Sequence, residues 1–371
     1  MIVSLKEKNF MKDVRISDCV ESYTYHDFDV GQIPQCPIKG CTNEQLTTAP
    51  YRKIELPYCV RHGIRIHKNS QTFVYFNGDR EEDHIKARLR NFIFHNHKKY
   101  VEKHVLQGRT KVETWQLGYE NSEDAVSWNV FVGIVRAGAL SHAMSWLAGR
   151  KIDGEPELYL WGSHIDLDNN LHDFYPPLCQ AHESIEPDIQ RFQTEPDVML
   201  IVPKKILMCI EVKFTSGNTL AQIEKEKENS GQKPKSVEGI LERYFIRNKF
   251  WKDGSRYIHP NDIDHKRFHG QLFRNIVFAS GMAEKFDGDW QVVNLVSSTQ
   301  WKKFKNKRAS TMYEDPSEAV RCYLTDQSKQ RFTFRTWENL FAYVIKDNSS
   351  LHDVAKYMKG KSAFFKPAFV L

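Results

Sequence analysis

The chain has few of the features that would place it in a membrane or outside a cell. None of its apolar runs approaches the ~20 residues that a membrane helix needs, and its N-terminal segment has no signal-peptide apolar core. The 7 cysteines are an odd number and widely spread, unlike those of a secreted disulfide scaffold. Internal repeats and extended low-complexity tracts are also missing. We therefore expect a protein of the reducing cytoplasm with no membrane association.

Positive charge is not strongly in excess, but it is clustered. The 371 residues carry a formal net charge of +6, and two basic runs contain interleaved aromatic residues, at 97–104 and 301–308. Such runs suit phosphate contact and base stacking, although a solvated loop or helix face is the alternative for either one. The second run supplies the candidate nucleic-acid-binding residues Lys302, Lys303, Lys305, Lys307 and Arg308. We expect a nucleic-acid partner.

Two apolar runs carry carboxylates where a buried strand should have none. Residues 195–202 and 206–214 flank a short basic turn, and they contain Asp197, Glu211 and Lys213. Ionised groups are rare in such runs unless they are paired or bound to a metal. Residues two apart share one face of a strand, so Glu211 and Lys213 should point the same way. These three residues form a candidate site.

The length of the turn decides whether the two carboxylates meet. If the hairpin loop is the three residues 203–205, then Val202 faces Ile206, and Asp197 lies opposite Glu211 with Cβ atoms about 4.5–5.5 Å apart. Two carboxylates at that separation repel unless one is protonated or a cation lies between them. A slip of one residue would move Asp197 to the other face. The candidate site therefore requires an odd loop or a bulge.

Carboxylate oxygens at this separation favour a hard cation. Mg²⁺ is commonly held by one or two carboxylates together with waters and substrate phosphates. Such an ion can polarise a phosphoryl oxygen and lower the pKa of bound water. Lys213 could orient or deprotonate the attacking water, or stabilise charge on the phosphate. The pattern predicts phosphodiester chemistry.

The same residues resemble a known family. Pro196-Asp197, a spacer of thirteen residues and Glu211-Val212-Lys213 resemble the PD-(D/E)XK nuclease superfamily, which includes many restriction endonucleases. The resemblance implies an α/β fold with a restriction-endonuclease-like αβββαβ core, a mixed central sheet flanked by helices. It also implies that Asp197, Glu211 and the carbonyl of Val212 contact Mg²⁺ or Mn²⁺, and that Lys213 is catalytic. The alternative is a surface hairpin with a solvated salt bridge, which strands apolar on both faces disfavour.

The superfamily usually adds an acidic residue from a helix before the first core strand. Residues 118–131 fit that place, with Ser122 as N-cap and acidic residues in the first turn. Glu123 is the preferred third carboxylate, both as metal ligand and as catalytic residue, with Glu120 in reserve. Compensation of the helix dipole alone is the alternative for either residue.

A later helix, at residues 268–279, resembles the one that follows the third core strand in this superfamily. Gln271 matches a polar position that often supports the site, and it could orient water or phosphate; a surface glutamine without a role is the alternative. Residues 290–296 are then expected to form a strand, and 336–341 to open a closing helix. The pair His265 and His269 has helical spacing but lacks the glutamate of a zinc-protease motif, so we predict that both lie on the surface.

A second metal site is predicted near the N-terminus. The spacing C-x4-C-x17-C-x2-H is close to that of two-knuckle structural zinc sites, although the first knuckle is wider than usual. Tetrahedral Zn²⁺ ligation would stabilise a segment with too little core of its own. Unligated thiols are the alternative. The candidate zinc ligands are Cys36, Cys41, Cys59 and His62.

Two regions are expected along the chain. Residues 1–110 would hold the zinc-binding region, a strand at 71–76 and a helix around 85–105; residues 111–371 would form the nuclease-like domain. A highly charged insertion at about 216–240 interrupts this domain and could become ordered over bound substrate.

These observations together predict a magnesium-dependent endonuclease with a structural Zn²⁺. DNA is favoured over RNA as the substrate, and the resemblance suggests restriction or another role in phage defence. Two copies could pair so that two sites cut two strands. The alternatives are a nucleic-acid-binding module that does not cut, an RNA-directed nuclease, and a structural protein assembled through its zinc site.

Overall fold

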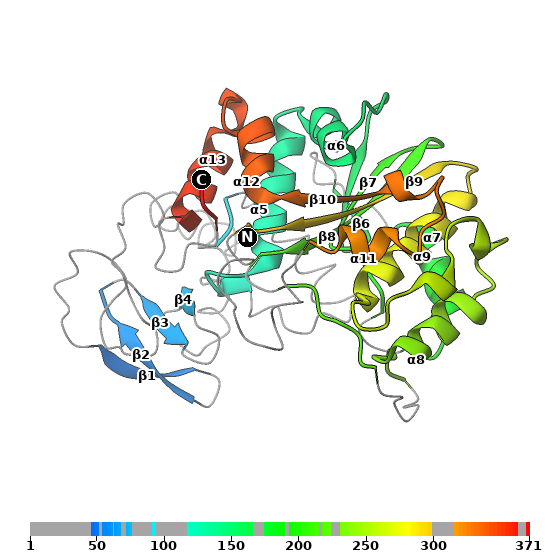
Figure 1. Ribbon diagram of the computed structural model, residues 1–371. Helices are drawn as coiled ribbons and strands as arrows, with labels where there is room; N and C mark the ends of the chain where they lie inside the picture. The colour runs from blue at the N-terminus through cyan, green and yellow to red at the C-terminus, as the bar shows by residue number, and fades with distance from the viewer. Residues whose placement is uncertain are drawn as a thin grey trace, which may run out of the picture.

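The computed structural model describes most of the chain from residue 46 onward. The described residues are 46–51, 54–61, 63–67, 72–75, 91–93, 117–165, 174–189, 193–214, 217–223, 231–298, 315–362 and 369–371. They form a four-stranded sheet near the N-terminus and a six-stranded sheet with helices on both faces (Figure 1). None of the helices in these ranges is both long enough and apolar enough to cross a membrane.

The N-terminal sheet is antiparallel, with its strands in chain order. A tight turn joins its second and third strands: Gly63 has a φ of 60°, and its N–H donates to the carbonyl of Cys59 over 2.8 Å. The fourth strand is the one predicted in this part of the chain. The strands are β1 (Thr47–Tyr51), β2 (Ile54–Cys59), β3 (Ile64–His67) and β4 (Thr72–Tyr75).

The central sheet is mixed, as predicted. Its order is β10-β9-β8-β7-β5-β6; the pairs from β6 to β8 are antiparallel, and β8, β9 and β10 are parallel. The strands are β5 (Glu157–Leu160), β6 (Ser163–His164), β7 (Val198–Val202), β8 (Ile206–Lys213), β9 (Asp289–Val296) and β10 (Phe332–Thr336).

The helices complete the predicted αβββαβ order, which runs α5, β5, β7, β8, α9, β9. The α-helices are α5 (Glu123–Arg136), α6 (Leu140–Ala148), α7 (Pro176–Ile185), α8 (Val237–Leu241), α9 (Gly270–Glu284), α11 (Ser317–Arg321), α12 (Trp337–Leu340) and α13 (His352–Ser362). The π-helical turns Glu242–Ile246 and Phe341–Ile345 extend α8 and α12. Short 3₁₀ turns are Gly254–Arg256, Pro260–Asp262, Lys329–Arg331 and Ser349–Leu351.

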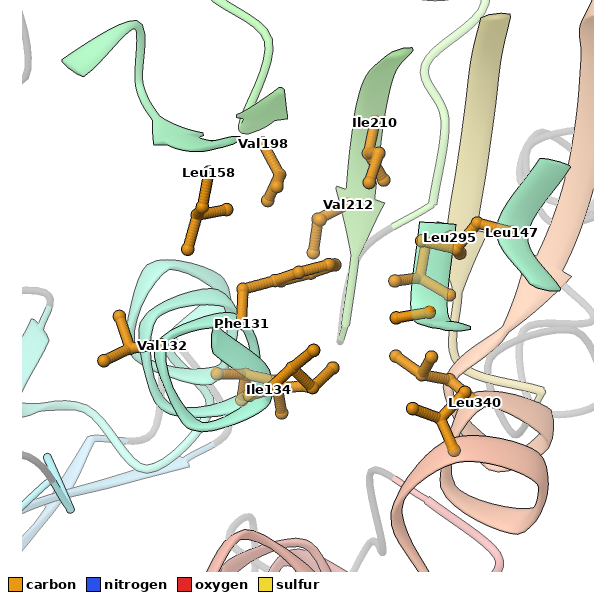
Figure 2. Close-up of a cluster of buried hydrophobic side chains, with 14 of the residues drawn as sticks. Phe131, Val132, Ile134, Leu147, Leu158, Val198, Ile210, Val212, Leu295 and Leu340 are labelled. Atoms are coloured by element: carbon orange, nitrogen blue, oxygen red, sulfur yellow. The ribbon is translucent and has the colours of Figure 1, made fainter. Parts of the chain in front are cut away.

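Every residue of β7 and β8 is buried, so both faces of the hairpin pack against protein. Ile210 and Val212 belong to the core beneath α5, α6, α12 and α13, and Figure 2 shows Phe131 of α5 extending toward Val212. Leu207 and Cys209 belong to the opposite core, beneath α7, α8 and α9. Burying each such side chain contributes about 1.5–3 kcal/mol.

Two sequence predictions are wrong. The helix expected around 85–105 does not run through residues 91–93, the part of that range that the structure describes, because Asn129 occupies the backbone groups that helix bonds would use: it accepts from the N–H of Ile93 and donates to the carbonyl of Asn91. His269 is not on the surface but only 4% exposed, whereas His265 is exposed. His269 directly precedes Gly270, where an added Cβ would lie 2.6 Å from Ile240 Cδ1 and 3.8 Å from Ala221 Cβ, so described residues that follow β8 pack beside the start of α9.

Candidate active site

The hairpin has the turn and register that the site requires. Val202 pairs with Ile206 across a three-residue loop, in which Lys204 takes a left-handed φ of 59°. Continued past the last pair of the ladder, this register brings Asp197 beside Glu211. Asp197 lies just before the first residue of β7, where the strand has not yet begun.

The C-terminal end of β8 extends beyond the first residue of β7. There, two carboxylates accept the hydrogen bonds that β7 would otherwise accept. Asp197 Oδ2 accepts from the N–H of Val212 over 2.9 Å, and Glu123 Oε1 accepts from the N–H of Phe214 over 3.1 Å. Alternate N–H groups of a strand point to the same side, so both acids lie along one edge of β8. Glu123 reaches this edge as the first residue of α5, which Ser122 caps through the N–H of Ala125.

Glu211 and Lys213 form a buried ion pair on the face that α9 covers. Lys213 Nζ donates to Glu211 Oε1 over 2.5 Å, and the side chain of Glu211 is 0% exposed. Asn275 of α9 donates to the other oxygen, Oε2, over 2.9 Å. Burial would lower the pKa of Lys213, but the charges of Glu211, Glu123 and Asp197 and the hydrogen bond to Glu211 outweigh it and hold this pKa above its ordinary value.

Two further asparagines form a hydrogen-bonded pair next to the backbone of Glu211. Asn294 of β9 donates to the carbonyl of Glu211 over 3.3 Å, and Asn218 donates to the side-chain oxygen of Asn294 over 2.6 Å. Both are buried. Sequence reasoning missed these residues and Asn275; the available signal was a polar amide inside an otherwise apolar strand or helix.

A buried network holds the segment that leads into Asp197. Glu186 is 0% exposed and accepts from the N–H and hydroxyl of Thr194 over 2.7 and 2.5 Å, and from the hydroxyl of Tyr244 over 2.5 Å. A ring nitrogen of His182 lies 2.8 Å from the carbonyl oxygen of Thr194. Thr194 is thereby fixed from two sides, three residues before Asp197.

The two candidates for the third acid, Glu123 and Glu120, have different contacts in the structure. Glu123 contacts β8, whereas Glu120 forms an ion pair with Lys361 of α13 at 3.1 Å, and both of these side chains are buried. Gln271 is half-buried on α9, one turn before Asn275. Asn275, and not Gln271, is therefore the residue of this helix that contacts Glu211 in the structure.

Several predicted residues lie outside the described part of the chain. Cys59 ends β2 and is buried. The three other candidate zinc ligands are Cys36, Cys41 and His62, and they fall outside the described ranges, as do the basic runs at 97–104 and at 301–308, with Lys302, Lys303, Lys305, Lys307 and Arg308.

The acids around Lys213 fit a hard divalent cation. Carboxylate and carbonyl oxygens are the ligands that such ions prefer, and a carboxylate offers about four lone-pair sites, of which the described side-chain hydrogen bonds of Glu211 use two. Among the residues that the structure describes, no three His, Cys, Asp or Glu side chains converge to hold an ion. Asp197 and Glu211 are the two acids that the hairpin register brings side by side.

The fold and this cluster define a mixed α/β protein with acids and a lysine gathered at the end of a buried hairpin. A family model described as restriction endonuclease associating with ARP matches residues 57–361. The match spans more than half of the chain, which therefore belongs to this restriction endonuclease-like family. It includes Cys59 and His62 but not Cys36 or Cys41. No curated protein and no solved structure matches the chain.

Proposed function

We propose that the protein is a metal-dependent endonuclease that hydrolyses phosphodiester bonds in DNA, in restriction or another form of phage defence. Membership of a restriction endonuclease-like family supports a nuclease role. The observation that carries the proposal is the buried pair of Glu211 and Lys213 beside Asp197, because a burial so costly in desolvation suits a functional site better than a structural one.

The roles follow from position and charge. Asp197, Glu211 and the carbonyl of Val212 would hold Mg²⁺ or Mn²⁺, with Glu123 as the third acid. Bound there, the ion would polarise a phosphoryl oxygen and lower the pKa of water. The charges of Glu211, Glu123 and Asp197 outweigh burial and hold the pKa of Lys213 above its ordinary value, which favours the protonated form. We assign Lys213 to stabilising charge on the phosphate and orienting water.

Three groups would support this centre. Gln271, one turn before Asn275 on α9, would contact water or phosphate. The basic run at 301–308 would contact the DNA backbone. A structural Zn²⁺ held by Cys36, Cys41, Cys59 and His62 would stabilise the N-terminal region.

Cleavage of supercoiled plasmid in Mg²⁺ tests the proposal. We expect wild type to nick or linearise the plasmid, and Asp197→Asn and Lys213→Met to lose about 10²-fold or more in rate, since each removes charge stabilisation at the reacting phosphate. Asp326→Asn, at an exposed ion pair with Lys329, is the matched control and should cut normally.

The other outcomes identify the rival functions. Binding of DNA without cutting by wild type would favour a nucleic-acid-binding module. Cutting restricted to RNA oligonucleotides would favour an RNA-directed nuclease. Absence of both binding and cutting, with DNA and with RNA, would favour a structural protein.

A further inference from the structure

The helix that supports Glu211 begins without the usual compensation of its dipole. α9 has 15 residues; no side chain caps its N-terminus, and its first turn has no acidic residue. The first N–H groups of a helix lack intrahelical partners and form its positive end. His269, the residue that precedes the helix, is 4% exposed, and its Nδ1 has no hydrogen-bond partner in the described part of the chain.

An arginine folds back onto this positive end. Side chains of a helix point toward its N-terminus, and Arg274 Nη1 lies 3.7 Å from the place that a Cβ on Gly270 would occupy. The guanidinium carbon lies 5.8 Å from the centroid of the Tyr244 ring. Arg274 Nε is buried and has no hydrogen-bond partner among the described residues. A cation beside a helix N-terminus is unfavourable by itself, and an anion would relieve that repulsion.

A second cation comes from the charged insertion. Lys235, two residues after Lys233, is held near the start of α9: the N–H of Gln222 donates to its carbonyl over 2.8 Å, and the N–H of the adjacent Ala221 donates to the carbonyl of Phe268, just before α9. Lys233 is half-buried. Its segment is therefore attached to the region where α9 begins.

Burial is the main cause that lowers the pKa of Lys233, and the charge of Arg274 adds to it. Three carboxylates act on Lys233: those of Glu186, Glu195 and Glu211. Burial and the charge of Arg274 nevertheless outweigh them and lower the pKa of Lys233 to about 8. Glu186 is already hydrogen-bonded to Thr194 and Tyr244, and Glu211 to Lys213 and Asn275.

We propose that Lys233, Arg274 and the first turn of α9 form a subsite for a phosphate group, which holds the nucleic-acid backbone phosphate next to the one cleaved at Glu211. The inference rests on the proposed function. Asn275 follows Arg274 directly and contacts Glu211, and five residues of helix separate Gly270 from Asn275 by about 7.5 Å. The subsite is thus beside the reacting centre but separate from its acids.

Inorganic phosphate tests the subsite without reference to cleavage. Phosphate, compared with chloride at equal ionic strength, should raise the melting temperature of wild type, because a ligand that binds the folded state stabilises it. Lys233→Gln and Arg274→Gln should remove most of that rise, and Arg274→Lys should retain part of it. Arg247→Gln is the matched control, since Arg247 is exposed and pairs with Glu242.

Binding of a DNA oligonucleotide in Ca²⁺ tests the identity of the phosphate. Removing one charged contact should weaken binding about tenfold and reduce the slope of log affinity against log salt by about one. A single methylphosphonate next to the cleaved bond should weaken wild type but not Lys233→Gln any further.

The failures can be told apart. If wild type cuts DNA while Lys233→Gln and Arg274→Gln bind it with unchanged affinity and salt slope, the subsite is refuted and the nuclease proposal stands. If wild type neither binds nor cuts nucleic acid, the nuclease proposal fails, and a phosphate-dependent rise in melting temperature would then overturn the nucleic-acid subsite in favour of a free phosphate ligand.

Discussion

Removing the positive charge of Lys213 should lower the free energy of unfolding far more than the loss of an exposed ion pair would. Lys213 Nζ and Glu211 Oε1 are 2.5 Å apart, and their side chains are 10% and 0% exposed. In Lys213→Met the carboxylate of Glu211 stays buried, with Asn275 as its remaining described side-chain partner. Breaking a buried pair in this way costs about 3–5 kcal/mol, a large part of the about 5–15 kcal/mol that stabilises a typical domain.

Urea unfolding of three variants measures this cost. Lys213→Met should unfold at a clearly lower urea concentration than wild type, and the double variant Glu211→Gln, Lys213→Met should recover part of the loss because no buried charge is left unpaired. Lys329→Met is the control: the pair of Lys329 and Asp326 is almost as short, at 2.7 Å, but exposed, so little or no change is expected.

A divalent cation should restore part of what Lys213→Met loses. If Ca²⁺ binds beside Glu211, it supplies the missing positive charge, and it should raise the melting temperature of the variant more than that of wild type. An unfolding midpoint of Lys213→Met equal to that of Lys329→Met would refute the reasoning, because it would mean that Glu211 bears no buried charge that needs a partner.

Three further predictions concern groups around the site. Asn275→Leu should lower metal affinity or cleavage about 10–100-fold, measured by Mg²⁺ titration of cleavage, since it removes a hydrogen bond that orients Glu211; unchanged Mg²⁺ dependence would contradict it. Burial lowers the pKa of Lys361 in the folded state, so the unfolded chain binds that proton more tightly, and wild type should gain stability over Lys361→Met in urea unfolding as the pH rises toward about 10.4, the ordinary pKa of lysine; a constant difference would contradict it. Elemental analysis should find one zinc per chain, reduced by Cys59→Ser, and absence of zinc from both would exclude the Cys3His site.

The fold could be predicted from local patterns to a large extent. Apolar residues on both faces of the hairpin identified strands buried on both sides, and Ser122 and Thr336 were correctly placed as residues that begin helices. The helix expected around 85–105 failed at 91–93 because the groups that replace its hydrogen bonds come from Asn129, in another element. Such a partner is not visible in a local window.

The same limit applies to the site. The alternation of a strand and the length of one loop were enough to bring Asp197, Glu211 and Lys213 to one face, because these are short-range properties of a hairpin. The contact of Asn275 with Glu211 depends on how α9 packs across the sheet, 64 residues away in sequence. Gln271, which the spacing singled out on the same helix, lies one turn before Asn275.

The strand pairing at the end of β8 determines where the acids of the candidate site lie. That strand extends past the first residue of β7, so the N–H groups of Val212 and Phe214 have no strand partner there, and a buried N–H without a partner costs about 1–3 kcal/mol. Asp197 and Glu123 accept from these two groups, which gives each acid a structural role of its own. Because the two hydrogen bonds place both carboxylates beside Lys213, the irregular start of β7 both removes ladder bonds and gathers the charges of the site. If β7 began earlier, its own carbonyl groups would accept from the N–H groups of Val212 and Phe214. The hydrogen bonds that hold Asp197 and Glu123 beside Lys213 would then be lost.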